Sequence, residues 1–81
     1  MIKIKIKCFS HVKYALGTDG LDIVLEEGTT LESLEKKIRT KAGGKLDGVS
    51  LRIALNKQYT SADKVLKNGD EVAFIPPVQG G

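Results

Sequence analysis

Apolar and polar residues alternate from Ile2 to Cys8 in the opening segment MIKIKIKCF. The apolar side holds Ile2, Ile4, Ile6 and Cys8, and the polar side holds Lys3, Lys5 and Lys7. A period of two is typical of a β-strand with one buried face. The pattern therefore predicts an N-terminal strand with Cys8 buried beside the isoleucines and the lysines in solvent.

Residues 10–25 predict a short helix followed by a second strand. Ser10 is a suitable N-cap residue, and Gly17 can end the helix in a left-handed conformation. After a turn signal at residues 18–20, the segment Leu21–Leu25 reads LDIVL and predicts the strand. The two strands would form a loose hairpin with the helix in its loop.

The clearest helix is predicted between residues 29 and 42. Thr29 and Glu32 stand three residues apart, which is the spacing of a capping box. Apolar residues then recur at helical spacing, while the other face is polar. They are Leu31, Leu34, Ile38 and Ala42. Gly43 is well placed for the C-cap, so the segment predicts one amphipathic helix.

The second half of the chain predicts two further strands with a weaker element between them. Alternating apolar residues predict a third strand over residues 49–55. Residues 58–66 predict a short strand and a helical turn. Asn68 and Gly69 indicate a turn because both tolerate positive φ. The last strand, Glu71 to Ile75, runs directly into two prolines.

This order of elements predicts an α+β domain. One helix buries one apolar stripe and needs one face of a sheet for it. The simplest arrangement is a four- to five-stranded mixed sheet over one main helix, with the first and last strands parallel at its centre. That is the β-grasp, or ubiquitin-like, fold. We expect it to occupy residues 1–76 and to be followed by a flexible C-terminal Gly-Gly tail at residues 77–81.

Composition narrows the class of protein. The 81 residues suffice for one domain, and 28% charged with 41% apolar residues is ordinary for a globular chain. No segment approaches the roughly 18 apolar residues of a membrane span. Met1 leads into alternating lysines and not into a signal sequence, so we expect a cytoplasmic protein without membrane contact.

Few side chains are available for chemistry. Cys8 and His11 are the single cysteine and histidine, which argues against a disulfide framework and a zinc site. We therefore expect no metal and no bound cofactor. The net charge of +3 could suit nucleic acid, but no Arg-rich or aromatic-interleaved stretch accompanies it. A solvated basic face is therefore favoured over a nucleic-acid-binding site. No group of catalytic side chains in the sequence indicates an enzyme that acts alone.

The chain ends in FIPPVQGG, which is its most distinctive chemical feature. Pro76 and Pro77 cannot donate backbone hydrogen bonds, so they would stop the last strand and project the tail outward. Residues 77–81 can span about 15 to 18 Å when extended. Gly80 and Gly81 carry no side chain that would block a narrow channel. The terminal carboxylate could then be activated by another enzyme as an acyl adenylate, whereas the alternative interpretation is a frayed end.

The segment NGDEVAFIPPVQGG, residues 68–81, closely resembles the C-terminal signature of the MoaD/ThiS family of ubiquitin-like sulfur carriers, and within it the small subunits of molybdopterin synthase. The N-terminal strand, the stretch CFSHVKYALGTD and the main helix extend the resemblance over essentially the whole chain. It implies that a MoeB-like, E1-like adenylyltransferase uses ATP to adenylate Gly81, which becomes a thiocarboxylate. A MoaE-like large subunit would then pass the sulfur to cyclic pyranopterin monophosphate in molybdenum cofactor biosynthesis.

The resemblance also assigns roles along the tail. Gly80 and Gly81 match the functional end of the family, and Pro76, Pro77 and Val78 match its presenting segment. The carrier would be the sulfur-donating subunit, with catalysis in the large subunit. The remaining interpretations are a sulfur carrier for thiamine or tRNA thiolation, a ubiquitin-like protein modifier, and a plain interaction domain.

Phe9 and Ile75 are predicted to form an exposed apolar patch near the tail. Phe9 breaks the parity of the buried isoleucines, and a carrier that docks on two enzymes in turn needs apolar contact area. Ile75 stands where an aromatic residue is common in the family, so the details of partner contact can differ here. The three lysines of the first strand would at most help in docking to acidic partner surfaces.

Overall fold

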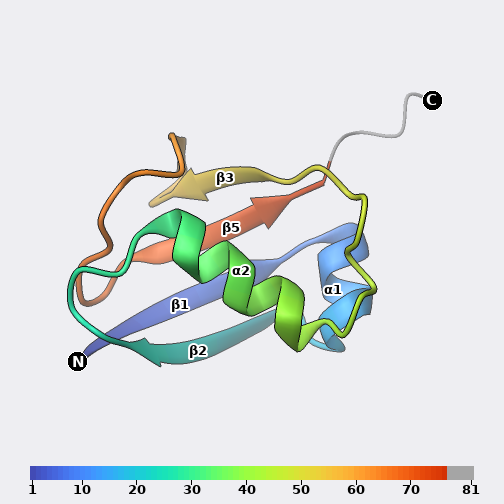
Figure 1. Ribbon diagram of the computed structural model, residues 1–81, viewed down its shortest axis with the longest axis horizontal. Helices are drawn as coiled ribbons and strands as arrows, with labels where there is room; N and C mark the ends of the chain where they lie inside the picture. The colour runs from blue at the N-terminus through green and yellow to red at the C-terminus, as the bar shows by residue number, and fades with distance from the viewer. Residues whose placement is uncertain (77–81) are drawn as a thin grey trace.

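Five strands form one mixed sheet, and a long helix lies across one of its faces (Figure 1). The structure is a computed structural model that describes residues 1–76. Its elements are β1 (Ile2–Cys8), α1 (Ser10–Leu16), β2 (Gly20–Leu25), α2 (Leu31–Lys41), β3 (Arg52–Leu55), β4 (Gln58–Tyr59) and β5 (Glu71–Ile75). No helix in this part of the chain is long and apolar enough to cross a membrane.

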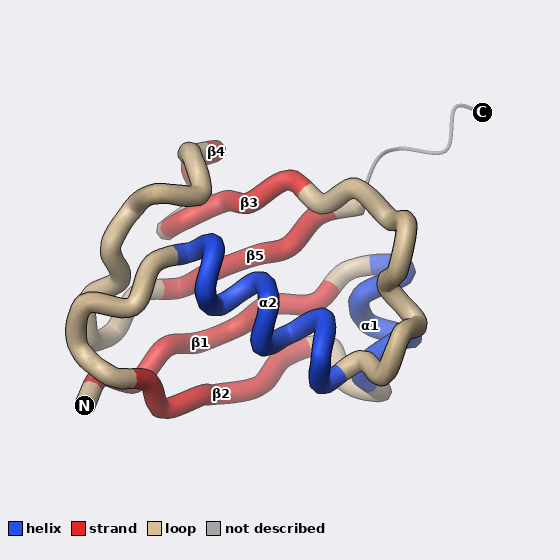
Figure 2. The backbone as a smooth tube through the Cα atoms, viewed as in Figure 1, coloured by secondary structure: helices blue, strands red, loops and turns tan. Residues whose placement is uncertain are grey.

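The strand order is β2-β1-β5-β3-β4, so the first and last strands lie together in the interior of the sheet (Figure 2). β1 runs parallel to β5 and antiparallel to β2. β3 runs antiparallel to both β5 and β4. This topology confirms the predicted β-grasp arrangement of a five-stranded mixed sheet over one main helix.

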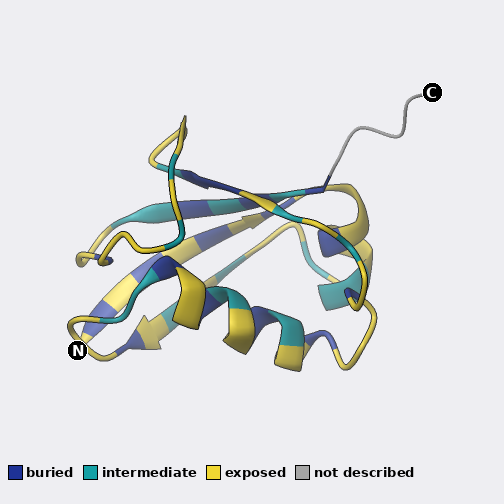
Figure 3. Ribbon diagram, turned by 45° about the horizontal axis from the view of Figure 1, so that its top comes forward, coloured by how far each residue is buried: buried dark blue, intermediate teal, exposed yellow. Residues whose placement is uncertain are grey.

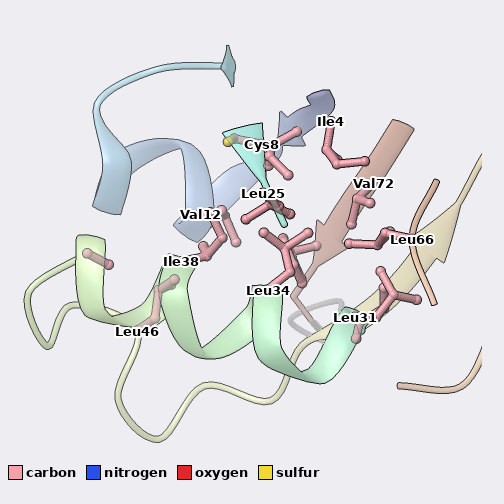
Figure 4. Close-up of a cluster of buried hydrophobic side chains, with 14 of the residues drawn as sticks. Ile4, Cys8, Val12, Leu25, Leu31, Leu34, Ile38, Leu46, Leu66 and Val72 are labelled. Atoms are coloured by element: carbon pink, nitrogen blue, oxygen red, sulfur yellow. The ribbon is translucent and has the colours of Figure 1, made fainter. Parts of the chain in front are cut away.

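The core lies between α2 and the sheet. β1 alternates between buried and exposed positions without a fault, as the colouring by burial shows (Figure 3). Its buried side chains meet those of α2 and β5 in one cluster (Figure 4). Cys8 belongs to this cluster and is 3% exposed, as predicted. Leu46 is also fully buried, although the sequence indicated only a loop there.

The predicted capping box at the start of α2 is wrong by one residue. Thr30 is the N-cap residue, and its hydroxyl oxygen accepts a hydrogen bond from the backbone N–H of Ser33 at 3.3 Å. The hydroxyl of Thr29 donates instead to the carbonyl oxygen of Glu26 at 2.7 Å. With Thr30 as the N-cap, the residue three positions later is Ser33 and not a glutamate, so the reciprocal bond of a capping box is missing.

Phe9, and not Ser10, is the N-cap residue of α1, and it makes no side-chain capping bond. Its carbonyl oxygen accepts from the N–H of Val12 at 3.0 Å, which begins the helical hydrogen bonding one residue earlier than predicted. Ser10 has a φ of 48°, so its backbone lies outside the extended region that an N-cap residue adopts. Gly17 ends α1 in the left-handed conformation, as predicted.

The loop after α2 is held by Arg39. Its Nε donates to the carboxylate of Glu35 at 2.9 Å, and its terminal nitrogens donate to the carbonyl oxygens of Leu46 at 2.6 Å and Val49 at 2.7 Å. The Val49 carbonyl is thereby engaged away from the sheet. β3 begins at Arg52, which pairs with Ile75 at the end of β5, so the strand is shorter than the alternation from residue 49 had predicted.

Two smaller predictions in the same half are also corrected. Ala42 is the C-cap residue of α2, because its N–H still donates to the Ile38 carbonyl, and Gly43 follows with a φ of 64°. The short strand β4 is present at the predicted place. The residues after it contain a turn at 62–63 in place of the predicted helical turn.

The turn before β5 is fastened by the side chain of Asp70. Its carboxylate accepts from the backbone N–H of Lys67 at 2.8 Å and from the side-chain amide of Asn56 at 3.1 Å. The amide oxygen of Asn56 in turn accepts from the N–H of Glu71 at 2.9 Å. The aspartate of the NGDE sequence therefore has a structural role, since it fixes where β5 begins.

Candidate functional site

β5 ends at Ile75, directly before the first proline, and Pro76 is the last residue that the structure describes. Pro76 is buried, so the described chain is anchored in the fold up to this point. The predicted roles of Pro77, Val78, Gly80 and Gly81 lie outside the described residues. The site that can be built from the structure is the surface around the base of the tail.

A groove of about 300 Å³ lies on the sheet face opposite α2 and reaches Ile75. It is lined by residues from four strands, from the β1–α1 junction and from the β3–β4 turn, and we call it the docking groove. Its apolar lining residues are Phe9, Ala54, Tyr59, Ala73 and Ile75, and its charged lining residues are Lys7, Lys57 and Glu71.

Strand parity brings these side chains to one face. The buried residues of β1 point toward α2, so the intervening lysines point to the opposite face. In β5, Val72 and Phe74 are buried and face the core, which leaves Ala73 and Ile75 on the open side. An apolar strip therefore runs along a face that carries charged residues elsewhere.

The two residues predicted to form an apolar patch both line this groove. Phe9 is 46% exposed, because it follows the end of β1 and caps α1 without entering the core. Ile75 is half-buried. Tyr59 is 57% exposed and was not predicted, because the pairing that brings β4 next to β3 cannot be read from sequence. Ala73 lies two residues before Ile75 in the same strand and so faces the same side of the sheet. This spacing could have predicted Ala73 from the sequence.

Charges surround the apolar strip. The Lys7 ammonium lies 3.8 Å from the Glu71 carboxylate. The guanidinium of Arg52 lies 4.1 Å from the ring centroid of Tyr59, a cation–π contact at the outer strand. Lys3, Lys5 and Lys7 are exposed, as the sequence predicted. The open face is therefore mainly basic around an apolar centre.

Neither a metal cluster nor a reactive cysteine is found among residues 1–76. Residues 1–76 contain no group of three or more His, Cys, Asp or Glu side chains that could hold a metal ion. Burial raises the pKa of the Cys8 thiol, and the Asp19 carboxylate raises it further. A protonated, buried thiol is a poor nucleophile. The chemistry must therefore come from elsewhere than Cys8.

Residues 6–81 match the ThiS family. The chain belongs to the ThiS family. The match includes β5 and the Gly-Gly end, so it covers both the groove and the tail that follows it.

Relatives and solved structures resemble this ThiS-family chain over its whole length. The molybdopterin synthase sulfur carrier subunit of Dictyostelium discoideum is 38% identical, with 98% of this chain and 96% of that protein covered. The structure of a putative molybdopterin converting factor, subunit 1, from Pyrococcus furiosus is 31% identical with a TM-score of 0.87, covering 96% of this chain and all of that one.

A third comparison concerns an assembly. The solved complex of subunits 1 and 2 of the molybdopterin-converting factor from Helicobacter pylori contains a chain that is 24% identical with a TM-score of 0.69. The alignment covers 99% of this chain and all of that one. At this identity the likeness shows the fold alone, and the fold it shows is the β-grasp.

Proposed function

We propose that this chain is the sulfur carrier subunit of a molybdopterin synthase. The observation that carries the proposal is its similarity, over the whole chain, to a subunit of that name at 38% identity. The fold agrees with it, because β5 delivers the chain directly into the diproline and the Gly-Gly end.

In the proposed cycle, the Gly81 carboxylate attacks the α-phosphate of ATP on a MoeB-like adenylyltransferase, and pyrophosphate leaves. Sulfur at the oxidation level of sulfide, supplied by the donor, then displaces AMP from the acyl adenylate, so a C–S bond replaces the bond from the acyl carbon to the AMP oxygen. The product is a thiocarboxylate at Gly81. This chemistry needs no cysteine in the carrier, in agreement with the buried, protonated Cys8.

The charged carrier then binds a MoaE-like large subunit, where its sulfur passes to cyclic pyranopterin monophosphate. Water takes the place of the sulfur at Gly81, and the carboxylate is restored. The solved Helicobacter pylori complex of subunits 1 and 2 supports this kind of partner. The carrier itself binds no cofactor in this cycle, since ATP is used by the activating enzyme, and we expect the cycle to run in the cytoplasm.

The docking groove supplies the contact surface in this proposal. It joins exposed aromatic area to the point where the tail leaves the fold. A partner that covers the groove would therefore hold the tail base at a fixed place, and residues 77–81 could reach about 15 to 18 Å beyond it. Pro76, Pro77 and Val78 would present Gly80 and Gly81 to the partner.

Reconstitution of the synthase tests this function. The full-length chain is charged with the adenylyltransferase, ATP and a sulfur donor, and is then mixed with the large subunit and cyclic pyranopterin monophosphate. We expect molybdopterin to form in proportion to charged carrier. If the charged carrier gives no molybdopterin but supports thiazole formation or tRNA thiolation, the carrier mechanism holds and the assigned pathway is wrong.

A further inference from the structure

Lys57 lies in a tight turn whose backbone favours glycine. Leu55 pairs with Gln58, so Asn56 and Lys57 are the two loop residues of the β3–β4 hairpin. Their φ values are 51° and 73°. Positive φ at both loop residues defines a type I′ turn, for which Asn followed by Gly is the preferred sequence. The chain has asparagine in the first position but lysine in the second.

A lysine in this conformation is strained, because its Cβ crowds the following carbonyl oxygen, and glycine would avoid that contact. The fold gives no structural reason for the lysine. Its side chain is exposed, and the three ion pairs found within residues 1–76 involve the other cations Lys7, Lys36 and Arg39. Strained residues of this kind collect at sites of function.

The position of Lys57 indicates what its side chain contributes. Lys57 lines the docking groove together with Phe9, Tyr59 and Ile75. Glu71, the one acidic residue of the groove lining, already faces Lys7 at 3.8 Å. The groove therefore has an apolar centre and an excess positive charge at its β3–β4 end. Its complement is an apolar protrusion with a carboxylate beside it.

We propose that the Lys57 ammonium binds a carboxylate of the protein that occupies the docking groove, and that this protein is the large subunit of molybdopterin synthase. This inference rests on the proposed function and adds a residue that selects the partner by charge. It also explains why the turn retains a strained lysine, since glycine would stabilise the turn but remove the cation.

Three variants separate the charge from the backbone. Lys57→Gly removes both the strain and the cation, Lys57→Gln removes only the cation, and Lys57→Arg keeps the charge. Lys37→Gln, on the exposed face of α2, is the matched control for a loss of charge away from the groove. Calorimetry measures the Kd of the full-length chain for the isolated large subunit at several salt concentrations, and thermal unfolding gives Tm.

We expect Lys57→Gly and Lys57→Gln to bind about three- to five-fold more weakly at low salt, as for the loss of one accessible ion pair. Their Kd values should also depend less on salt than that of the unaltered chain. Lys57→Arg and Lys37→Gln should bind like the unaltered chain. Lys57→Gly should unfold at a Tm no lower than that of the unaltered chain, because the strain is gone.

Unchanged binding of both Lys57→Gly and Lys57→Gln would overturn the proposal. Weaker binding by Lys57→Gly with normal binding by Lys57→Gln would overturn it as well, because the backbone and not the charge would then matter. If the unaltered, folded chain does not bind the large subunit at all, the proposed function itself is refuted.

Discussion

Phe9 offers a direct test of the docking groove, because nearly half of its surface is exposed. A phenylalanine side chain has roughly 200 Å² of surface. With Phe9 46% exposed, about 90 Å² is available to a partner. At about 25 cal/mol per Å², burial of that area would contribute about 2.3 kcal/mol, which corresponds to a roughly 50-fold change in Kd.

We therefore expect Phe9→Ala to weaken binding of the isolated large subunit by about 10- to 50-fold, the lower limit applying if the partner covers only part of the ring. Calorimetric titration of the purified full-length variants measures this. Tyr14→Ala is the matched control, because Tyr14 is an aromatic residue of the neighbouring helix α1, is 82% exposed and does not line the groove.

Binding by Tyr14→Ala should equal that of the unaltered chain. Thermal unfolding accompanies the titration, since Phe9→Ala also removes the buried half of the ring and should lower Tm by several degrees. The reasoning is refuted if folded Phe9→Ala binds as tightly as the unaltered chain. Equal weakening by both alanine variants would also refute it, because the groove would then have no special part in binding.

Three further predictions concern Cys8 in the core and Arg39 beside the loop after α2. Cys8→Ala should support complete sulfur transfer in the reconstituted synthase. Because burial raises the pKa of the Cys8 thiol above its ordinary value of 9.0, the unfolded chain loses this proton before the folded chain does. The thiol's contribution to the free energy of unfolding should be complete below about pH 9 and should decline above it. Urea titrations at several pH values measure this decline, and Cys8→Ala should lack the part of it that comes from the thiol. Arg39→Ala should lower the free energy of unfolding by about 2 to 3 kcal/mol, because the carbonyls of Leu46 and Val49 lose a charged donor. Lys37→Ala on the same helix should change it by less than about 0.5 kcal/mol in the same urea titration.

Periodicity predicted the parts of the fold in which one face is buried. In β1 every second residue faces the core, and in α2 every third or fourth residue does. Both repeats can therefore be recognised in the sequence. The parallel pairing of β1 with β5 is also present, and it was predicted as part of the β-grasp arrangement and not from periodicity. The break in parity at Phe9 also predicted its exposure, and Phe9 lines the docking groove together with Ile75.

The details that failed depend on contacts between distant segments. The first N–H groups of α2 donate to a different part of the chain: Leu31 to the carbonyl of Lys64 at 3.0 Å, and Glu32 to that of Ala62 at 2.9 Å. These bonds replace part of the predicted capping box. The hydrogen bonds from Arg39 and the burial of Leu46 are likewise tertiary interactions, so no local sequence pattern predicted them.

Lys57 shows why the groove could be only partly predicted. Its role depends on the backbone conformation of a two-residue turn and on the pairing of a two-residue strand, β4. Neither is specified by periodicity, because both segments are too short to repeat. The proximity of Lys57 to Phe9 and Ile75 exists only once the sheet has formed.

Intact-mass spectrometry detects directly whether Gly81 carries the sulfur. The full-length chain and a variant lacking Gly81 are incubated with the adenylyltransferase, ATP and a sulfur donor. We predict that the full-length mass rises by the difference between one sulfur and one oxygen, with the change confined to the C-terminal peptide. The shortened chain should fold equally well and keep its mass. An unmodified full-length chain beside an active adenylyltransferase, or the same mass gain in the shortened chain, would show that Gly81 is not the sulfur carrier.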